Sequence, residues 1–265
     1  MQLLGKPPIL IARKIFAKVY WGGRSASRRR REALASRWLR GDGIEIGALN
    51  YPLRMQSSCR VTYVDRLHVE ELSHHYPELA RESLVDVELI DDGECLSTFP
   101  QDSQDFVIAN HFLEHCENPI GALGSWLRVL RPGGLAYFAV PDKRLTFDYR
   151  RPPTPWEHFL RDLHEGPSWS REGHYREWLE FANDTPPSEV AVRVQAFMES
   201  CYSIHFHVWT PRTLRDFLGR CQGEVGLPFT LSDFVRNGAE TICVLRKQRS
   251  QSLGQVEAER STLST

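Results

Sequence analysis

The sequence predicts an α/β protein built on a mostly parallel sheet, and three observations lead to this class. Short β-rich runs alternate with helical stretches between residues 43 and 141. This alternation is typical of a parallel sheet that has helices on both faces. The chain of 265 residues is 41% hydrophobic and 25% charged, which is enough apolar sequence for a full core. These proportions exclude a disordered, collagen-like or low-complexity protein.

The first half of the chain contains five predicted strands and three predicted helices. The strands are Ile44–Ile46, Val61–Val64, Val85–Ile90, Phe106–Ala109 and Leu135–Val140. Between them we expect helices at 50–57, 68–75 and 117–131. The last is the clearest, because Ile120, Leu123, Leu127 and Leu130 share one face and Pro132-Gly133-Gly134 is expected to end it.

The regular alternation stops after strand five. Residues 142–207 contain half of the ten histidines together with eleven aromatic residues, and we interpret them as an insertion. A helix is expected near Pro211–Arg220, with Thr210 as its N-cap. Strands at 228–235 and 240–246 follow, and Asn237-Gly238 between them is a hairpin signal.

Charge divides the chain into a basic arm and an acidic body. Residues 1–40 hold eleven Lys or Arg against Glu32, a net charge of +10, whereas the remainder carries −11. We therefore expect three parts: an arm over 1–40, a main domain over 41–246 and a disordered tail over 247–265.

The arm has several interpretations. Residues 1–24 interleave apolar and basic residues, as in an interfacial helix on an anionic membrane, and an acid-poor organellar presequence is an alternative. Nucleic acid is not an expected partner, because the acidic body lacks a long basic track. For residues 28–40 we favour a helix that packs on the domain through Leu34, Trp38 and Leu39.

Two further features bear on location. No apolar run approaches the roughly 20 residues of a spanning helix. The six cysteines are scattered, without paired spacing, which favours reduced thiols in an intracellular, cytoplasmic protein. Peripheral membrane contact through the arm is the alternative.

Three polar motifs follow the first three strands. In Glu45-Ile46-Gly47-Ala48-Leu49-Asn50, Gly47 allows a ligand to approach the backbone, although a tight strand-to-helix turn explains it as well. Asp65 ends strand two, where a carboxylate can accept both hydroxyls of a ribose or cap a helix. Asp91-Asp92-Gly93-Glu94 adds acid at the same rim, either for an adenine amino group or as a solvated turn.

Two longer motifs follow these three. One is the run from Ser103 through Asp105-Phe106-Val107 and Asn110-His111 to His115, and the other is Arg128-Val129-Leu130-Arg131-Pro132-Gly133-Gly134. In this order, the motifs resemble the class I S-adenosylmethionine-dependent methyltransferases. The resemblance implies a Rossmann-like sheet of seven strands, mostly parallel with an antiparallel last strand, and S-adenosylmethionine as cofactor. It also implies that Glu45 and Gly47 lie at the methionine end of the cofactor, Asp65 at the ribose, Asp92 at the adenine and Asn110 beside the sulfonium. Leu49 and Tyr51 depart from the glycine-rich pattern of the family's loop.

Transfer of a methyl group to a hydroxyl needs a base near the carboxyl ends of strands four and five. The candidates by position are His111, His115 and Asp142. The insertion is expected to form the acceptor lid, because aromatic residues beside His, Arg and Asp suit a sugar ring and its hydroxyls. For any single aromatic residue, packing in the insertion's own core is the stronger interpretation. The spacing of His and acidic residues predicts no metal site.

A narrower resemblance concerns the acceptor. Ile44-Glu45-Ile46-Gly47-Ala48-Leu49, the run from Val140 to Asp148, and Glu165-Gly166-Pro167-Ser168 with His174-Tyr175 are similar to bacterial methyltransferase-domain proteins of glycan biosynthesis. This similarity implies O-methylation of a sugar, a glycan-linked molecule or another small polar acceptor. Two alternatives are a non-catalytic scaffold protein with the same fold and an RNA methyltransferase, which the acidic body disfavours.

Overall fold

The computed structural model describes residues 24–75 and 82–249. The expected interfacial segment therefore lies outside the described residues except for Arg24, and so does most of the predicted tail.

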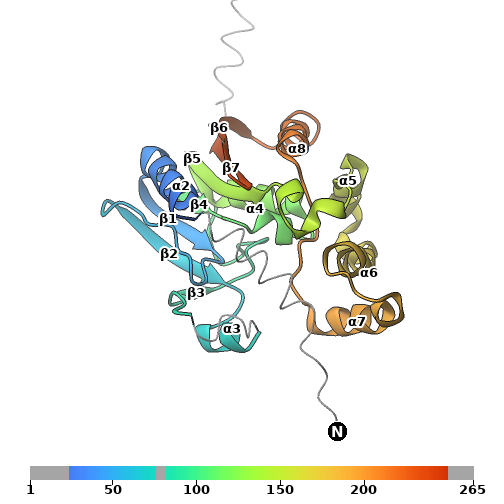
Figure 1. Cartoon of the computed structure of the whole chain (residues 1–265). Helices are drawn as coiled ribbons and strands as arrows, with labels where there is room; N and C mark the ends of the chain where they lie inside the picture. The colour runs from blue at the N-terminus through green and yellow to red at the C-terminus, as the bar shows by residue number, and fades with distance from the viewer. Residues whose placement is uncertain (1–23, 76–81, 250–265) are drawn as a thin grey trace, which may run out of the picture.

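A seven-stranded sheet forms the centre of the molecule, in the order β3-β2-β1-β4-β5-β7-β6 (Figure 1). The first five strands are parallel, and β7 is antiparallel to both of its neighbours. The predicted sheet is thus confirmed in strand number and direction. The strands are β1 (Gly41–Ile46), β2 (Cys59–Asp65), β3 (Leu89–Ile90), β4 (Gln104–Ile108), β5 (Leu130–Pro141), β6 (Phe229–Asn237) and β7 (Glu240–Lys247).

Helices cover both faces of this sheet (Figure 1). They are α2 (Arg24–Trp38), α3 (Val69–His75), α4 (Pro119–Val129), α5 (Trp156–Glu165), α6 (Arg171–Glu177), α7 (Pro187–Ser200) and α8 (Pro211–Gly223). Side chains of β5 alternate between two cores, as a strand requires. Phe138 and Val140 pack in the core that contains α4, α5 and α8, whereas Tyr137 and Ala139 pack in the core that contains α2.

Several elements lie within a few residues of their predicted bounds, with α4 at Pro119–Val129 against a predicted 117–131. Helix α4 starts at Pro119, and the Asn118 side chain accepts a hydrogen bond from the Gly121 amide at 2.9 Å. Thr210 caps α8 and forms a reciprocal capping box with Thr213. The turn at Asn237-Gly238 joins β6 to β7, and Gly238 takes the positive φ (65°) that this hairpin needs.

The helix expected at 50–57 is wrong, because this segment is irregular. Pro52 has no amide hydrogen, and the amide of Leu53 donates to the buried carboxyl group of Glu45. The strand expected at 85–90 is confirmed only for Leu89–Ile90. Pro132-Gly133-Gly134 does not end a helix, because α4 stops at Val129 and these residues belong to β5.

The basic run of residues 28–40 forms most of α2, which packs on the sheet as predicted. Ala35 of α2 and Leu39, the residue after the helix, are fully buried. Leu34 and Trp38 are partly buried and pack against the same core. The indole of Trp38 also donates to Asp233 on β6 at 3.1 Å. Helix α2 is therefore part of the domain's core layer.

The region after β5 contains α5, α6 and α7, which lie to one side of the sheet (Figure 1). Tyr175, Trp178 and Phe206 contribute to a separate small core there, in agreement with the prediction that most of its aromatic residues pack together. His205 and His207 lie in the irregular segment 202–208 that leads to α8.

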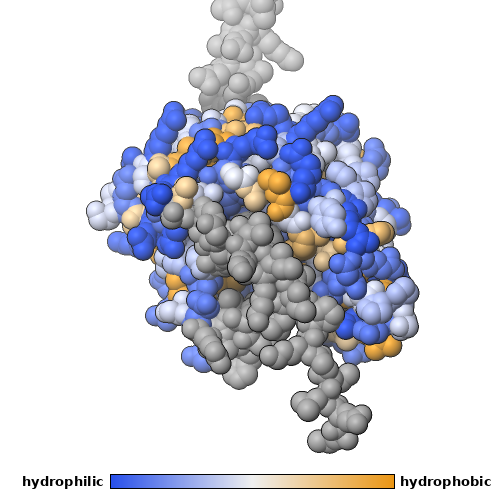
Figure 2. Space-filling model, in the orientation of Figure 1, coloured by the Kyte–Doolittle hydropathy of each residue, from blue (hydrophilic) through white to orange (hydrophobic). Residues whose placement is uncertain are grey.

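The face of the molecule in Figure 2 is mostly hydrophilic, with apolar residues in small separate groups. In the described part of the chain, no helix has both the length and the apolar character to cross a membrane. All six cysteines are free thiols.

Candidate active site

The predicted site residues follow the carboxyl ends of parallel strands, which meet at one rim of the sheet. Gly47 follows β1, Asp65 ends β2, Asn110 follows β4 and Asp142 follows β5. The loop after β1 is held to β2 by a hydrogen bond of 2.9 Å from the Gly47 amide to the Val64 carbonyl.

The loop after β1 keeps glycine-like backbone geometry at two positions. Gly47 has φ +62° and Leu49 has φ +49°, both in the left-handed region that glycine favours. A Cβ at position 47 would lie 3.4 Å from the Phe112 ring. Leu49 therefore adopts a conformation that glycine would take without strain, at a cost of about 1 kcal/mol.

Glu45 is buried directly beneath this loop. Both of its carboxyl oxygens accept the Leu53 amide, at 3.0 and 3.1 Å, and its exposure is 1%. Burial raises the pKa of Glu45 to about 8, against the opposing effects of this hydrogen bond and of the Arg31 charge. The carboxyl group is therefore mostly protonated at neutral pH.

The two acids expected at the ribose and the adenine differ in environment. Asp65 is partly buried, which raises its pKa, and one of its oxygens accepts the Arg66 amide at 2.7 Å. Asp92 is exposed and accepts the Glu94 amide at 2.9 Å within its own turn. The neighbouring Asp91 stabilises the loop after β3, because its carboxylate accepts hydrogen bonds from the Thr98 hydroxyl at 2.6 Å and the Thr98 amide at 2.9 Å.

The Asn110 side chain has a polar atom whose hydrogen-bonding capacity is not used within the described part of the chain. Its side-chain Oδ1 is buried and has no hydrogen-bond partner among the described residues. A buried amide oxygen without a partner costs about 1–3 kcal/mol, so it marks a place where a ligand group would be accommodated.

His111, the next residue, is held between two buried acids. Its Nε2 lies 2.7 Å from Glu240, and its Nδ1 lies 3.3 Å from Glu114. Burial lowers the pKa of His111, but the hydrogen bonds and charges of these two acids outweigh it, so that the pKa is raised. Glu240 also pairs with Arg31 of α2, and its pKa falls to about 2 although burial opposes this.

The pKa of His115 is shifted in the opposite direction from that of His111. Burial and the nearby His205 ring lower the pKa of His115 to about 4, so its imidazole is neutral at pH 7. Its Nδ1 lies 3.1 Å from the Ser203 hydroxyl, and the His205 ring meets it edge-on with centroids 4.8 Å apart. His205 is itself held by Asp148 at 2.6 Å.

The carboxyl group of Asp142 is paired with Arg144, two positions further along the chain. Its oxygens accept from the Arg144 guanidinium at 2.6 and 2.9 Å and from the Arg144 amide at 3.2 Å. Burial raises the pKa of Asp142, but these bonds outweigh it and hold the pKa below its usual value. The structure thus brings His111 and His115 together around Glu114, whereas Asp142 caps a short 3-10 turn.

Sequence reasoning missed the acids that partner the histidines. Glu240 lies 129 residues from His111 along the chain, so no local pattern connects them. One signal was available: the predicted hairpin starts β7 at Glu240, which places it opposite Pro141 at the end of β5. Glu114 and the pair of Asp148 with His205 carried no comparable signal.

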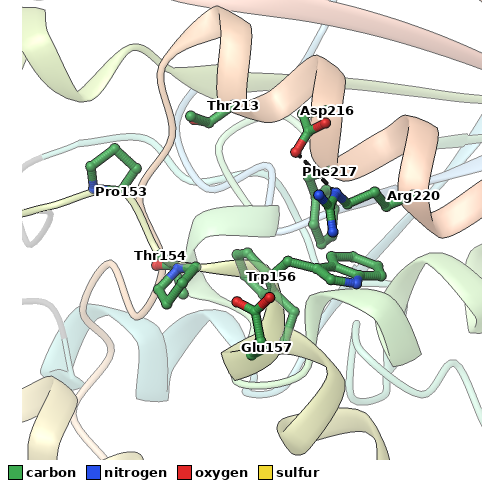
Figure 3. Close-up of a pocket in the computed structure, with 10 residues that line it drawn as sticks. Pro153, Thr154, Trp156, Glu157, Thr213, Asp216, Phe217 and Arg220 are labelled. Carbon is green, nitrogen blue, oxygen red and sulfur yellow. Dashed lines mark ion pairs between the residues drawn. The ribbon is translucent and has the colours of Figure 1, made fainter. Parts of the chain in front are cut away.

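Two surface hollows lie outside this rim. One, of about 380 Å³, is lined by α5 and α8, where Trp156 and Phe217 face Arg220 and its ion pair with Asp216 (Figure 3). The other, of about 530 Å³, is formed mainly by the irregular segment after β1. Neither is lined by a predicted site residue, so the candidate chemistry lies at the rim.

The strand order and the polar rim define a class I S-adenosylmethionine-dependent methyltransferase, whose cofactor is S-adenosylmethionine. Sequence comparison gives the family: residues 32–220 match a methyltransferase-domain family, and the chain belongs to it. No curated protein matches the sequence.

Solved structures of low identity are similar to most of the chain. A methyltransferase from Thermotoga maritima is 15% identical over 91% of this chain and 97% of its own, with a TM-score of 0.46. One from Aquifex aeolicus is 11% identical over 87% and 96%, with a TM-score of 0.45. A chain from the complex of the Haloferax volcanii Trm112 methyltransferase activator with a methyltransferase is 13% identical over 89% of this chain and 93% of its own, with a TM-score of 0.47. The family assignment rests on the sequence match.

Proposed function

We propose that this methyltransferase modifies a hydroxyl group of a sugar, a glycan-linked molecule or another small polar acceptor. In this proposal Glu45 and Gly47 hold the methionine end of the cofactor, Asp65 its ribose, Asp92 its adenine and Asn110 the region of the sulfonium. The left-handed loop at Gly47 and the orphaned Asn110 oxygen support this assignment. When bound, S-adenosylmethionine supplies an electrophilic methyl group.

The single observation that carries the proposal is the position of His115, which follows β4 at the rim with its Nδ1 3.1 Å from the Ser203 hydroxyl. An acceptor hydroxyl must lose its proton as its oxygen is methylated, and only a deprotonated imidazole can take that proton. The lowered pKa of His115 keeps it in this form at pH 7. His111 is disfavoured as the base because both of its ring nitrogens face buried carboxyl groups, Nε2 at 2.7 Å from Glu240 and Nδ1 at 3.3 Å from Glu114.

The charge of Glu114 partly offsets the burial that disfavours the protonated form of His115. The Glu114 carboxyl group is buried and lies close to His115 and His205. His111 closes the other side of Glu114 at 3.3 Å. The chain's own groups therefore accept a proton at His115 beside a buried negative charge.

The surroundings of His115 support a polar acceptor. The Ser203 hydroxyl meets its Nδ1, and the Phe147 ring lies 4.8 Å from His205. Aromatic faces beside hydroxyl and imidazole groups suit a sugar, whose rings are apolar on their faces and polar at their edges.

The test uses full-length protein with isotope-labelled S-adenosylmethionine and separate glycan, RNA and protein fractions. We expect label in the glycan or small-molecule fraction, with a loss of about 10²–10⁴-fold in kcat for His115→Gln. The control His164→Gln removes an exposed imidazole from α5 and should leave activity unchanged. Calorimetry should show equal cofactor binding by both variants.

Other outcomes identify the alternatives. Label found only in RNA or only in protein would refute the acceptor proposal. Absence of cofactor binding by the wild-type protein would favour the non-catalytic scaffold.

A further inference from the structure

Four potential metal ligands converge in the region after β5, although their sequence spacing predicts no metal site. His158 and Asp162 lie one turn apart on α5, His174 lies on α6, and His207 lies on the segment that leads to α8. One ligand atom from each side chain falls within 4.8 Å of all the others. Three are buried, and His158 is partly exposed.

Three of the six distances between these atoms are close to those of tetrahedral coordination. His158 Nε2 lies 3.0 Å from His174 Nε2 and 3.3 Å from Asp162 Oδ2, and His207 Nε2 lies 3.6 Å from the same oxygen. Four ligands about 2.0–2.1 Å from a zinc ion stand about 3.3 Å apart. The three separations of 3.0, 3.3 and 3.6 Å bracket this value, and all six are within 4.8 Å.

The Asp162 carboxyl group gives a second, independent observation that points to a cation. Its side chain is fully buried, and Oδ2, the oxygen that faces the histidines, has no hydrogen-bond partner among the described residues. Its other oxygen accepts the Ser170 hydroxyl at 3.0 Å, which fixes the carboxyl group in place. A buried carboxylate oxygen without a partner is costly, and a cation would satisfy it.

His207 can also serve as a ligand without rearrangement of its ring. Its Nδ1 is buried and without a hydrogen-bond partner among the described residues, whereas its Nε2 lies 3.2 Å from the Glu117 carbonyl oxygen. A neutral ring that carries its proton on Nδ1 leaves the Nε2 lone pair for a metal. Coordination would then replace the contact with Glu117.

We propose that His158, Asp162, His174 and His207 bind one Zn²⁺ ion in a structural site. Three imidazoles and one carboxylate in four-coordinate geometry suit zinc, and four protein ligands leave no open position for catalysis. The ion would join α5 and α6 to the segment at His207, whose amide donates to the Glu114 carbonyl at 3.3 Å. It would thereby fix this region against the turn that carries His111 and His115.

The experiment measures metal in the full-length protein, purified with an affinity tag that contains no histidine. We expect about one zinc per chain by mass spectrometry. After chelation, reloading with Co²⁺ should give the strong visible absorption of tetrahedral coordination. Reloading with Zn²⁺ should raise the unfolding temperature.

Matched variants locate the site. Asp162→Asn and His174→Gln should abolish Co²⁺ absorption, whereas His164→Gln, an exposed change on the same helix, should retain it. Ser170→Ala, which removes the hydroxyl that supports Asp162 and also contacts the Pro167 carbonyl, should weaken zinc binding by about 10–100-fold. Wild-type protein that folds, carries no zinc and gives no Co²⁺ absorption would overturn the proposal, even if a ligand variant fails to fold.

Discussion

Replacement of Glu45 by Gln should change how the stability of the protein depends on pH. The pKa of this carboxyl group rises from 4.5 to about 8 on folding. Between these values the unfolded chain releases a proton that the folded protein keeps, so Glu45 makes the free energy of unfolding fall as pH rises. Glu45→Gln stays neutral and can still accept the Leu53 amide through its Oε1, so it lacks this loss.

The size of the effect follows from the shift. Each pH unit inside the window is worth about 1.4 kcal/mol, so the variant should gain about 3 kcal/mol on the wild type between pH 5 and pH 7.5. Contributions from other groups, such as Glu94 with its pKa raised to about 7 by burial, are common to both proteins and cancel in the difference.

The assay is urea unfolding of both proteins at several pH values without cofactor, followed by fluorescence and far-ultraviolet circular dichroism. Glu157→Gln, which removes an exposed carboxyl group from α5, is the control and should show a nearly constant difference. A constant difference between Glu45→Gln and the wild type across this range would refute the claim that Glu45 is buried in its protonated form.

Three further changes test other contacts. Asp148→Ala should lower the free energy of unfolding by about 1.5–3 kcal/mol, because it removes one of the two carboxylates that pair with the buried Arg151, the other being Glu177; unchanged urea midpoints would contradict this. Thr210→Ala should cost about 1 kcal/mol through loss of the α8 cap, seen as a lower melting temperature, whereas Thr210→Ser should keep it. Asp65→Ala should weaken S-adenosylmethionine binding at least tenfold by calorimetry, and equal affinity would remove Asp65 from the proposed site.

Local patterns predicted most of the sheet and several helices. The α4 face, the Thr210 cap and the Asn237-Gly238 turn each depend on residues within a few positions of one another, and all three are confirmed. The helix expected at 50–57 failed because a distant group, the Glu45 carboxyl, takes the Leu53 amide. Tertiary contact overrode local preference there.

The polar clusters were harder to predict for the same reason. His158 and Asp162 share a helix face at i, i+4 spacing, which a sequence pattern can reveal. His174 and His207 reach them only through the packing of three separate segments. Likewise, His111 could be placed at the rim from its strand, but its partners Glu240 and Arg31 come from the two ends of the described chain.

The position of Arg31 also changes what the basic arm can offer to an anionic surface. Arg31 pairs with Glu240, and Arg28 pairs with Glu32 at 2.9 Å, so two arginines of the run at 28–31 have carboxylate partners inside the same molecule. Charge that is neutralised internally releases no counterions from an external polyanion. The salt dependence of any such attraction should therefore be shallower than the eleven Lys and Arg residues of 1–40 suggest.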